Sequence, residues 1–218
     1  MLRLWQLISP ALPIGAFAYS QGLEYAVEEG WVNNEDTAEQ WINGLINHSL
    51  SALDVPILAR LHKAWLTNDM EKVIYWNQYL QASRESNELL TEDRQIGCAL
   101  RQLLRDLEIP QLKLWPESEQ PSFTSMFALA ASHWQITVNE TCQGFLWSWS
   151  ENQVAAAIKL IPLGQTAGQR ILSKVIDEIP KAVERGLQLT DDEIGMTAHG
   201  LGIASALHET QYTRLFRS

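Results

Sequence analysis

The side chains that most often hold metal ions, histidine and cysteine, are scattered along this sequence. The histidines form no HxxxH or HExxH pair and none adjoins a cysteine; they are His48, His62, His133, His199 and His208. Cys98 and Cys142 are far apart and belong to no CxxC motif. Compact metal sites usually need closely spaced imidazole and thiolate ligands. We therefore expect no local metal site and two buried free thiols.

One loop and one serine were compared with known catalytic motifs, a phosphate loop and a nucleophile elbow. Residues 164–170, with the sequence GQTAGQR, faintly resemble a phosphate loop. They lack the Lys-Ser/Thr pair that reaches the terminal phosphates and Mg²⁺, and no strand is predicted before them. Ser20 is not part of a GxSxG elbow. Local motifs therefore favour a protein that is not an enzyme.

Three groups of polar residues stand in apolar surroundings. The alternating-charge run from Arg84 to Arg94 is typical of a solvated helix face with ion pairs three and four residues apart. Lys159 follows a long apolar stretch, where a cation complements the dipole of a helix C-terminus. The segment 9–24 contains two prolines and a glycine that fix an extended turn. A helix-entry loop and a binding site are both open interpretations of that segment.

The elements that must position these residues are helices. Apolar residues recur at steps of three and four, and the alternation typical of strands is scarce. This pattern predicts an all-α fold, a single domain over residues 1–218 built as a helical bundle of roughly eight to ten helices. Cap and proline signals predict helices over 35–53, from 54, from 69 or 70, and over 87–107, 123–134, 140–161, 163–176 and 181–187. Asn139 is the expected cap of the helix at 140, Pro180 the expected break between the last two helices, and 111–122 an expected surface loop.

Composition excludes several classes of partner. The net charge is −10, which repels nucleic acid and anionic lipid. No apolar run at the N-terminus has the length of a signal peptide or a membrane span, so we expect a cytoplasmic protein without membrane contact. The nine tryptophans suit a large core and also protein interfaces.

Four segments, taken together and in this order, resemble the UreF family of urease accessory proteins. They are SPALPIGAFAYSQGLE at 9–24, SRES and EDRQIG within 83–97, SWSENQVAAAIKLIPLGQTAGQR at 148–170 and HETQYTRLFRS at 208–218. Any one segment is weak evidence, but the ordered set spans nearly the whole chain. The family often has a second glycine after Gly15, where this chain has Ala16, and this changes the backbone freedom expected in that turn.

The resemblance implies an all-α, non-catalytic scaffold that forms a homodimer. It implies a bridge between UreD, also called UreH, and the GTPase UreG, in a complex that inserts nickel into apo-urease in a GTP-dependent step. Nickel is then handled by the complex, with no cofactor and no tightly bound nickel in this chain. Two alternatives stay open. The chain could be a GTPase-activating protein for UreG with Arg170 or Arg94 as an arginine finger, or an all-α metalloenzyme, against which the lack of paired Glu-x-x-His elements argues.

The resemblance also implies three sets of site residues. The set facing UreG is Lys159, Gln165, Thr166, Gln169 and Arg170. The set facing UreD is His208, Glu209, Gln211, Tyr212, Arg214, Leu215, Phe216 and Arg217. A structural or interface set is Pro13, Gly15, Tyr19, Ser20, Gln21, Glu24, Arg84, Glu85, Asp93 and Arg94.

The C-terminal tail carries the most specific expectation. Tyr212, Leu215 and Phe216 are apolar and have little neighbouring sequence to bury them. Ordering a segment of about ten residues costs on the order of 10 kcal/mol in backbone entropy. We therefore expect the tail, at about 205–218, to be loose in the free protein and to become ordered against UreD, with docking on its own dimer as the competing possibility.

Overall fold

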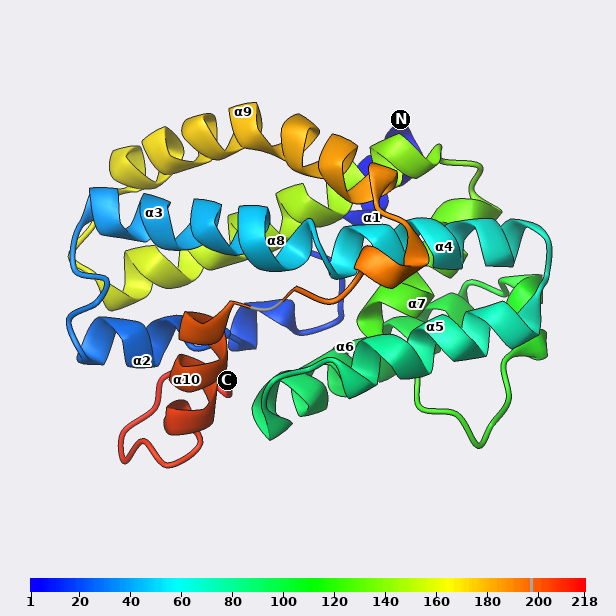
Figure 1. The fold of residues 1–218 in the computed structure, drawn as a ribbon, viewed down its shortest axis with the longest axis horizontal. Coiled ribbons are helices and arrows are strands. Elements are labelled where there is room, and N and C mark those ends of the chain that lie inside the picture. Colours follow the sequence, from blue (N-terminus) through cyan, green and yellow to red (C-terminus); the bar gives the residue numbers. More distant parts are fainter. Residues whose placement is uncertain (197) are drawn as a thin grey trace.

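The computed structural model describes residues 1–196 and 198–218, and all regular structure in these residues is helical. The α-helices in Figure 1 are α1 Leu2–Leu7, α2 Leu23–Glu28, α3 Glu35–Leu45, α4 Asp54–Leu66, α5 Met70–Ala82, α6 Asn87–Asp106, α7 Phe123–His133, α8 Val138–Leu160, α9 Gln165–Gln188 and α10 His199–His208. Short helical turns are η1 Ala16–Ala18, the π-helical η2 Ile46–Leu50, η3 Pro110–Leu114 and η4 Asp191–Glu193. The prediction of an all-α bundle of eight to ten helices is confirmed.

Most helices begin where the cap signals predict. Asn34 caps α3 in a capping box with Thr37, and Asp69 caps α5. The predicted cap of α8 is wrong, because Thr137 accepts the Glu140 N–H and the Glu140 side chain returns a bond to the Thr137 backbone. This reciprocal pair satisfies two helix-terminal donors, whereas a cap at Asn139 would leave Val138 outside the helix.

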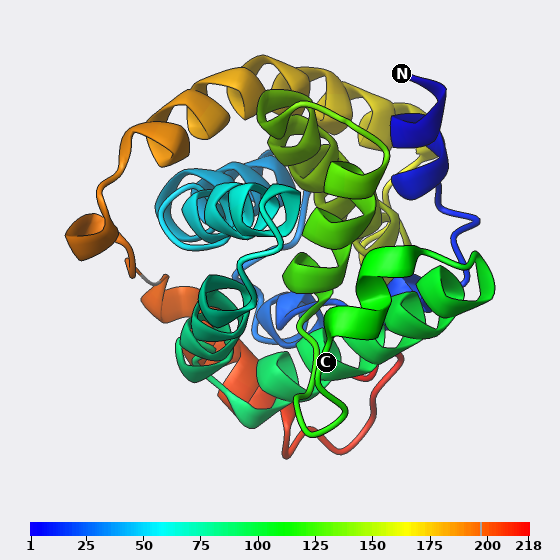
Figure 2. The same cartoon turned by 90° about the vertical axis from the view of Figure 1, so that its right-hand side faces the viewer.

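The predicted break at Pro180 is also wrong. One continuous helix, α9, contains Pro180, and Figure 2 shows it curving over the bundle. Ile179, Ala182 and Val183 are buried on either side of the proline and hold both halves against the same core. Proline removes one backbone hydrogen bond, which bends a helix without ending it when packing supports both sides.

One apolar core extends from Leu7 near the N-terminus to Phe216 near the C-terminus. The central helix is α4, which packs against α5, α7, α8 and α9 and buries most of its surface. In Figure 1, α3 and α4 cross the middle of the molecule in line, joined by η2, while α2 and α10 lie side by side below α3. No helix of the described residues is long and apolar enough to span a membrane.

The two thiols differ in position. Cys142 is buried as expected, and burial raises its pKa to about 12, so the thiol stays protonated. Cys98 is only partly buried, which corrects the expectation for this residue. The predicted surface loop 111–122 begins with the helical turn η3.

Candidate functional site

Residues 208–218, the C-terminal tail, lie against five polar residues that we call the tail seat: Ser20, Gln21, Glu24, Glu88 and Glu92. Glu24, in the first turn of α2, accepts the Leu215 N–H at 2.6 Å and the Phe216 N–H at 2.9 Å. Gly22, with φ of 75°, turns the chain into α2. A Cβ at this glycine would lie 3.0 Å from the Ser205 nitrogen of α10, so glycine permits the close approach of α10.

His208 joins the tail seat to the end of α10. Its buried ring lies between two carboxylates, with Nδ1 2.8 Å from Glu88 and Nε2 3.1 Å from Glu24. Arg214 donates to the second oxygen of Glu88 at 2.6 Å. Both ring nitrogens therefore have partners, and three helices, α2, α6 and α10, meet at one side chain.

The end of the tail is held by backbone and carboxylate contacts. The Ser20 and Gln21 N–H groups donate to the Ser218 main-chain oxygen at 2.6 and 3.1 Å. The Ser218 hydroxyl donates to Glu92 at 2.7 Å, and Gln21 donates to the other Glu92 oxygen at 2.7 Å. Burial raises the pKa of Glu92 to about 7, even though both of these hydrogen bonds favour the charged form.

These contacts bear on the expectation that the tail has little neighbouring sequence to bury its apolar side chains. Phe216 is only 6% exposed and Ser218 is buried, so distant parts of the same chain bury Phe216. Glu24 and Ser20 bind the backbone of the tail, although they are almost two hundred residues away in sequence. Tyr212 is fully exposed and Leu215 is 66% exposed. That the tail becomes ordered against UreD stays a prediction. Tyr212 and Leu215 are the apolar side chains left exposed for such a contact.

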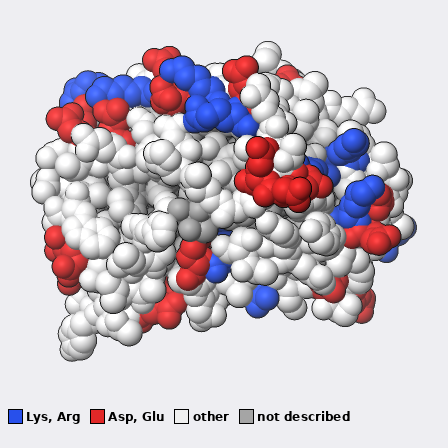
Figure 3. All heavy atoms as spheres, in the orientation of Figure 1, with Lys and Arg blue, Asp and Glu red and all other residues white. Residues whose placement is uncertain are grey.

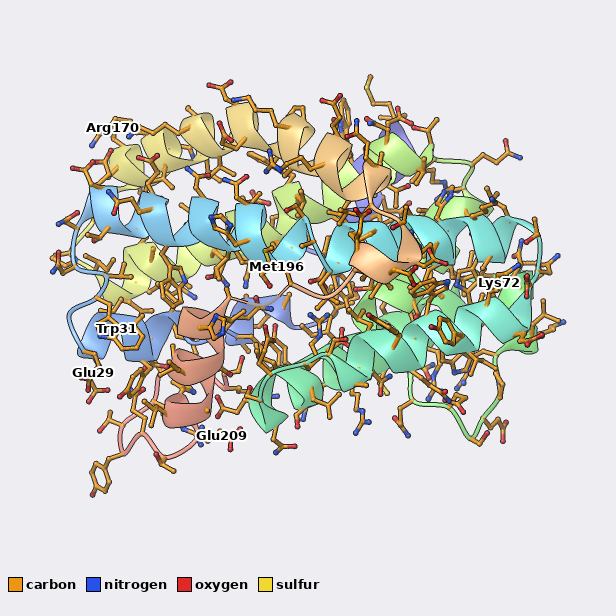
Figure 4. All side chains as sticks on the ribbon, in the orientation of Figure 1. Glu29, Trp31, Lys72, Arg170, Met196 and Glu209 are labelled. Atoms are coloured by element: carbon orange, nitrogen blue, oxygen red, sulfur yellow. The ribbon has the colours of Figure 1, made fainter. Side chains whose placement is uncertain are left out.

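The set predicted to face UreG lies on the first turns of α9 and at the end of α8. Gln165, Thr166, Gln169 and Arg170, which we call the α9 face, are all exposed. Arg170 pairs with Glu35 of α3, with Nε 2.8 Å from the carboxylate. Figure 4 shows Arg170 at the start of α9, and Figure 3 shows a row of Lys and Arg side chains along the edge formed by this helix. These polar groups are exposed to solvent, so they need no partner within the chain.

Lys159 connects the two predicted sets. It is exposed near the end of α8, and its Nζ lies 5.5 Å from the centroid of the Phe216 ring. An ammonium group at this distance from an aromatic ring is attracted by the ring quadrupole. Residues predicted for two different partners are therefore in contact, the exposed Lys159 lying over the buried Phe216.

The charge run from Arg84 to Arg94 is not a solvated helix face. Arg84 donates to Asp54 at 2.9 Å and lies 3.5 Å from Asp93, while Glu92 and Asp93 are buried. Among the charged residues of this run, only Arg94 is exposed, and its Nε donates to Gln81. The sequence did contain a signal that these carboxylates are buried. Glu92 and Asp93 lie three and four residues after Leu89 and four and three residues before Ile96, which places them on the apolar stripe of the helix.

Segment 9–24 serves mainly to hold other parts of its own chain. Gly15 has φ of 73°, a left-handed conformation that leads into η1, and Pro13 is exposed. The Tyr19 hydroxyl donates to Gln95 of α6 at 2.6 Å, and Asn152 of α8 donates to the Tyr19 carbonyl at 3.1 Å. Gln95 and Asn152 lie within the segments EDRQIG and SWSENQVAAAIKLIPLGQTAGQR, but neither was assigned a role, because the sequence does not show that these segments pack against Tyr19.

Among the residues that the structure describes, no three His, Cys, Asp or Glu side chains are grouped so that they could hold a metal ion. What the geometry does provide is an anchored peptide segment, an exposed charged helix end and a rigid helical frame between them. These features are typical of the class of helical proteins that present surfaces to other macromolecules.

Comparison with known proteins identifies the family. The profile of the UreF family matches residues 32–176. The urease accessory protein UreF of Alkalilimnicola ehrlichii is 51% identical over 216 residues, which cover 99% of this chain and 95% of that protein. The UreF proteins of Hahella chejuensis and Psychrobacter cryohalolentis are 46% and 48% identical, covering all of this chain and 98% and 94% of theirs. The chain belongs to the UreF family of urease accessory proteins, non-catalytic chaperones involved in urease maturation.

Proposed function

We propose that this chain is a scaffold that bridges UreD, also called UreH, to the GTPase UreG and so modulates GTP-dependent nickel insertion into apo-urease. The observation that carries the proposal is the contact between Lys159 and Phe216. It brings the residues predicted for UreG and the residues predicted for UreD onto one rigid frame. A scaffold needs no chemistry of its own, because a difference of a few kcal/mol in its affinity for two states of a partner shifts their populations.

The surface for UreD is the outer side of α10 and the tail. Ile203, Leu207, Tyr212 and Leu215 are exposed apolar side chains on this surface. Arg217 is exposed beside them and offers a forked donor for carboxylates or carbonyls. In Figure 4, Glu209 lies just beyond the end of α10, on the side of the molecule away from Arg170.

The surface for UreG is the α9 face with Lys159. Its residues are exposed and its one ion pair, Arg170 with Glu35, lies at the surface. Exposed pairs contribute little to stability and are easily exchanged for a pair with a partner.

Co-purification with separately tagged UreD and UreG tests the proposal. Tyr212→Ser with Leu215→Ser should reduce recovery of UreD but not of UreG, and Lys159→Ala should reduce recovery of UreG. The controls are Tyr75→Ser with Leu114→Ser and Lys63→Ala, because Tyr75 and Leu114 are exposed apolar side chains elsewhere on the chain, at 54% and 46%, and Lys63 is an exposed lysine. If each test variant lost UreD and UreG equally, or if the control variants lost them as much as the test variants did, the proposal of two separate surfaces would be contradicted.

The same preparation separates the scaffold from a GTPase-activating protein. GTP hydrolysis by UreG is measured with this chain alone and with the UreD complex. Stimulation by the chain alone that disappears in Arg170→Ala or Arg94→Ala would favour the arginine-finger alternative. No stimulation without UreD supports the scaffold.

We further propose that the chain is a homodimer. Leu2 and Trp5 are exposed on α1, and apolar surface of this kind is commonly covered by twofold pairing. Sedimentation at roughly tens of micromolar, a range suited to a standard-size interface, should give the dimer mass. A monomer at that concentration would contradict the proposal.

A further inference from the structure

His208 is the last residue of α10, and the tail leaves the helix bundle from this point. Its side chain is fully buried between Glu24 of α2 and Glu88 of α6. In Figure 1 the tail loops out below α10, and its end returns beside that helix. The ring therefore lies at the base of the tail, with one carboxylate on each side.

The hydrogen bonds of the ring determine its charge. Nδ1 lies 2.8 Å from Glu88, and Nε2 lies 3.1 Å from Glu24. An ionised carboxylate only accepts hydrogen bonds, so each ring nitrogen must carry a hydrogen to bond to it. A neutral imidazole has one N–H and one lone pair, and that lone pair would face a carboxylate. Only the doubly protonated imidazolium satisfies both contacts together.

The other partners of the two carboxylates favour their ionised form. Glu24 also accepts two backbone N–H groups of the tail, at 2.6 and 2.9 Å. The second oxygen of Glu88 accepts from Arg214 at 2.6 Å. Hydrogen bonds and a nearby cation both stabilise the charged form of a carboxyl group. The extra proton of the cluster therefore sits on His208, and two cations balance two anions.

Another buried histidine, His62, has the opposite surroundings. Its Nε2 lies 2.8 Å from the Ile136 carbonyl oxygen, and burial lowers the pKa of the ring. One carbonyl needs only one N–H, so a neutral ring satisfies this contact. Burial by itself thus removes the charge of a histidine in this fold. At His208 the two carboxylates are the feature that favours the charged ring.

Most other charged groups around His208 are carboxylates. Glu209 accepts the Glu88 N–H at 3.2 Å, at the start of α6. Glu92, one turn further along α6, binds the end of the tail, and Glu85 lies against α10. The nearest contribution from α8 is Lys159, which lies over an aromatic ring of the tail. Loss of the ring charge would leave these surroundings with an excess of negative charge.

We propose that His208 is a pH-sensitive switch that holds the tail on its own chain while the ring is doubly protonated and releases it when the ring loses one proton. Loss of the proton leaves a lone pair facing a carboxylate and removes the charge that balances Glu24 and Glu88. The docked tail binds this proton more tightly than the released tail does, so a rise in pH favours release. Release makes residues 209–218 available to a partner, and the switch does not depend on which partner takes them.

Nuclear magnetic resonance of the full chain tests the protonation state directly, because the nitrogen-15 shifts of the ring separate imidazolium from the two neutral tautomers. At pH 7 both nitrogens of His208 should have imidazolium shifts. The exposed His199 of the same helix should titrate as an ordinary histidine, near pH 6.5. A neutral His208 ring at pH 7, in a chain whose tail is docked, would overturn the proposal.

Hydrogen exchange at the Leu215 and Phe216 amides measures release of the tail. Their protection, corrected for the intrinsic effect of pH on exchange, should fall as the pH is raised from 6 to 9. The fall should reach at most about tenfold per pH unit, which is the limit for release coupled to one proton. Amides of the central helix α4 should stay protected, because the rest of the fold remains. Protection of the tail that does not change with pH would overturn the proposal.

Variants assign the pH dependence to one residue. His208→Gln should weaken protection of the tail already at pH 6 and remove most of its dependence on pH, whereas His199→Gln should behave as the parent does. Glu92 titrates in the same range, because burial raises its pKa to about 7. Glu92→Gln should nevertheless keep the fall in protection. A fall that persists in His208→Gln would overturn the proposal, and its loss in Glu92→Gln would then identify Glu92 as the switch.

Discussion

The tail seat and the α9 face are both polar, and they differ in burial. Glu24 in the tail seat is buried, and its carboxylate is shared by two backbone N–H groups and His208. Arg170 on the α9 face is exposed and has one partner, Glu35. Removal of a buried carboxylate leaves its hydrogen-bond donors without a partner. When one member of an exposed ion pair is removed, water takes its place.

Because of this difference, we expect the tail seat to affect the stability of the fold and the α9 face to affect the recruitment of UreG. Charged residues of the tail seat attach the tail to its own chain, and we expect their loss to change folding first. Charged residues of the α9 face contribute little to the fold and remain available to a partner. Four substitutions test this contrast, in order of decreasing effect on stability.

Glu24→Ala should have the largest effect. Removing the carboxylate leaves the Leu215 and Phe216 N–H groups and one nitrogen of His208 without a partner, so the free energy of unfolding should fall by roughly 3–5 kcal/mol. Denaturant unfolding gives the change, and hydrogen exchange at Leu215 and Phe216 shows whether the tail has detached. Glu28→Ala, an exposed residue of the same helix, is the control. A loss no larger than that of the control would mean that the tail seat does not hold the tail.

Glu92→Gln should change the pH dependence of stability. The pKa of Glu92 is about 7 in the folded chain, above its ordinary value of 4.5. Between these values the unfolded chain releases a proton that the folded chain keeps, so stability falls as pH rises through this window and levels off above 7. Glu92→Gln should remove about 2 kcal/mol of that fall. Denaturation midpoints at pH 5, 6, 7 and 8 measure it, and parallel curves for the variant and the parent would contradict the assignment.

Lys159→Ala lies at the boundary between the two regions. Loss of the contact with the Phe216 ring should cost about 0.5–1 kcal/mol, the usual range for an exposed cation–π pair. Recruitment of UreG should fall by much more than this loss explains. Lys159→Arg, which keeps the charge over the ring, is the matched control. If the variant recruits UreG as well as the parent does, Lys159 serves only to hold the tail and does not contact UreG.

Arg170→Ala should have the smallest effect on folding. Its ion pair with Glu35 is exposed, so we expect no measurable change in melting temperature. Binding of UreG, measured by calorimetry in the presence of UreD, should weaken. Glu35→Ala breaks the same ion pair while leaving Arg170 in place and should bind UreG at least as well. A clear drop in melting temperature for Arg170→Ala would show that the α9 face is structural.

Local signals predicted much of the fold. Asn34 and Asp69 begin their helices because each cap satisfies backbone donors within its own first turn, so neighbouring sequence is enough to identify it. The predicted helix break at Pro180 was wrong for the opposite reason. The continuation of α9 depends on the burial of Ile179 and Val183 against residues that are distant in sequence.

The candidate site was predicted only in part. The motifs at 9–24 and 208–218 were singled out separately, but nothing in the sequence indicated that they bind each other. Glu88 and Glu92 were assigned to a solvated face because an alternating-charge run has that meaning in most helices. Their partners, Arg214 and Ser218, lie 126 residues away in each case.

The sequence by itself determined the helical class, most helix starts and the family, because these depend on periodicity, caps and ordered motifs along the chain. Tertiary structure alone decided which charges are buried. Glu24 and Leu215 are 191 residues apart, and Arg170, with its side chain 57% exposed, and Arg84, with its side chain 16% exposed, are the same type of residue. Burial and pairing depend on the elements that packing brings together, and the free energy of a charge depends on that environment far more than on its neighbours in sequence.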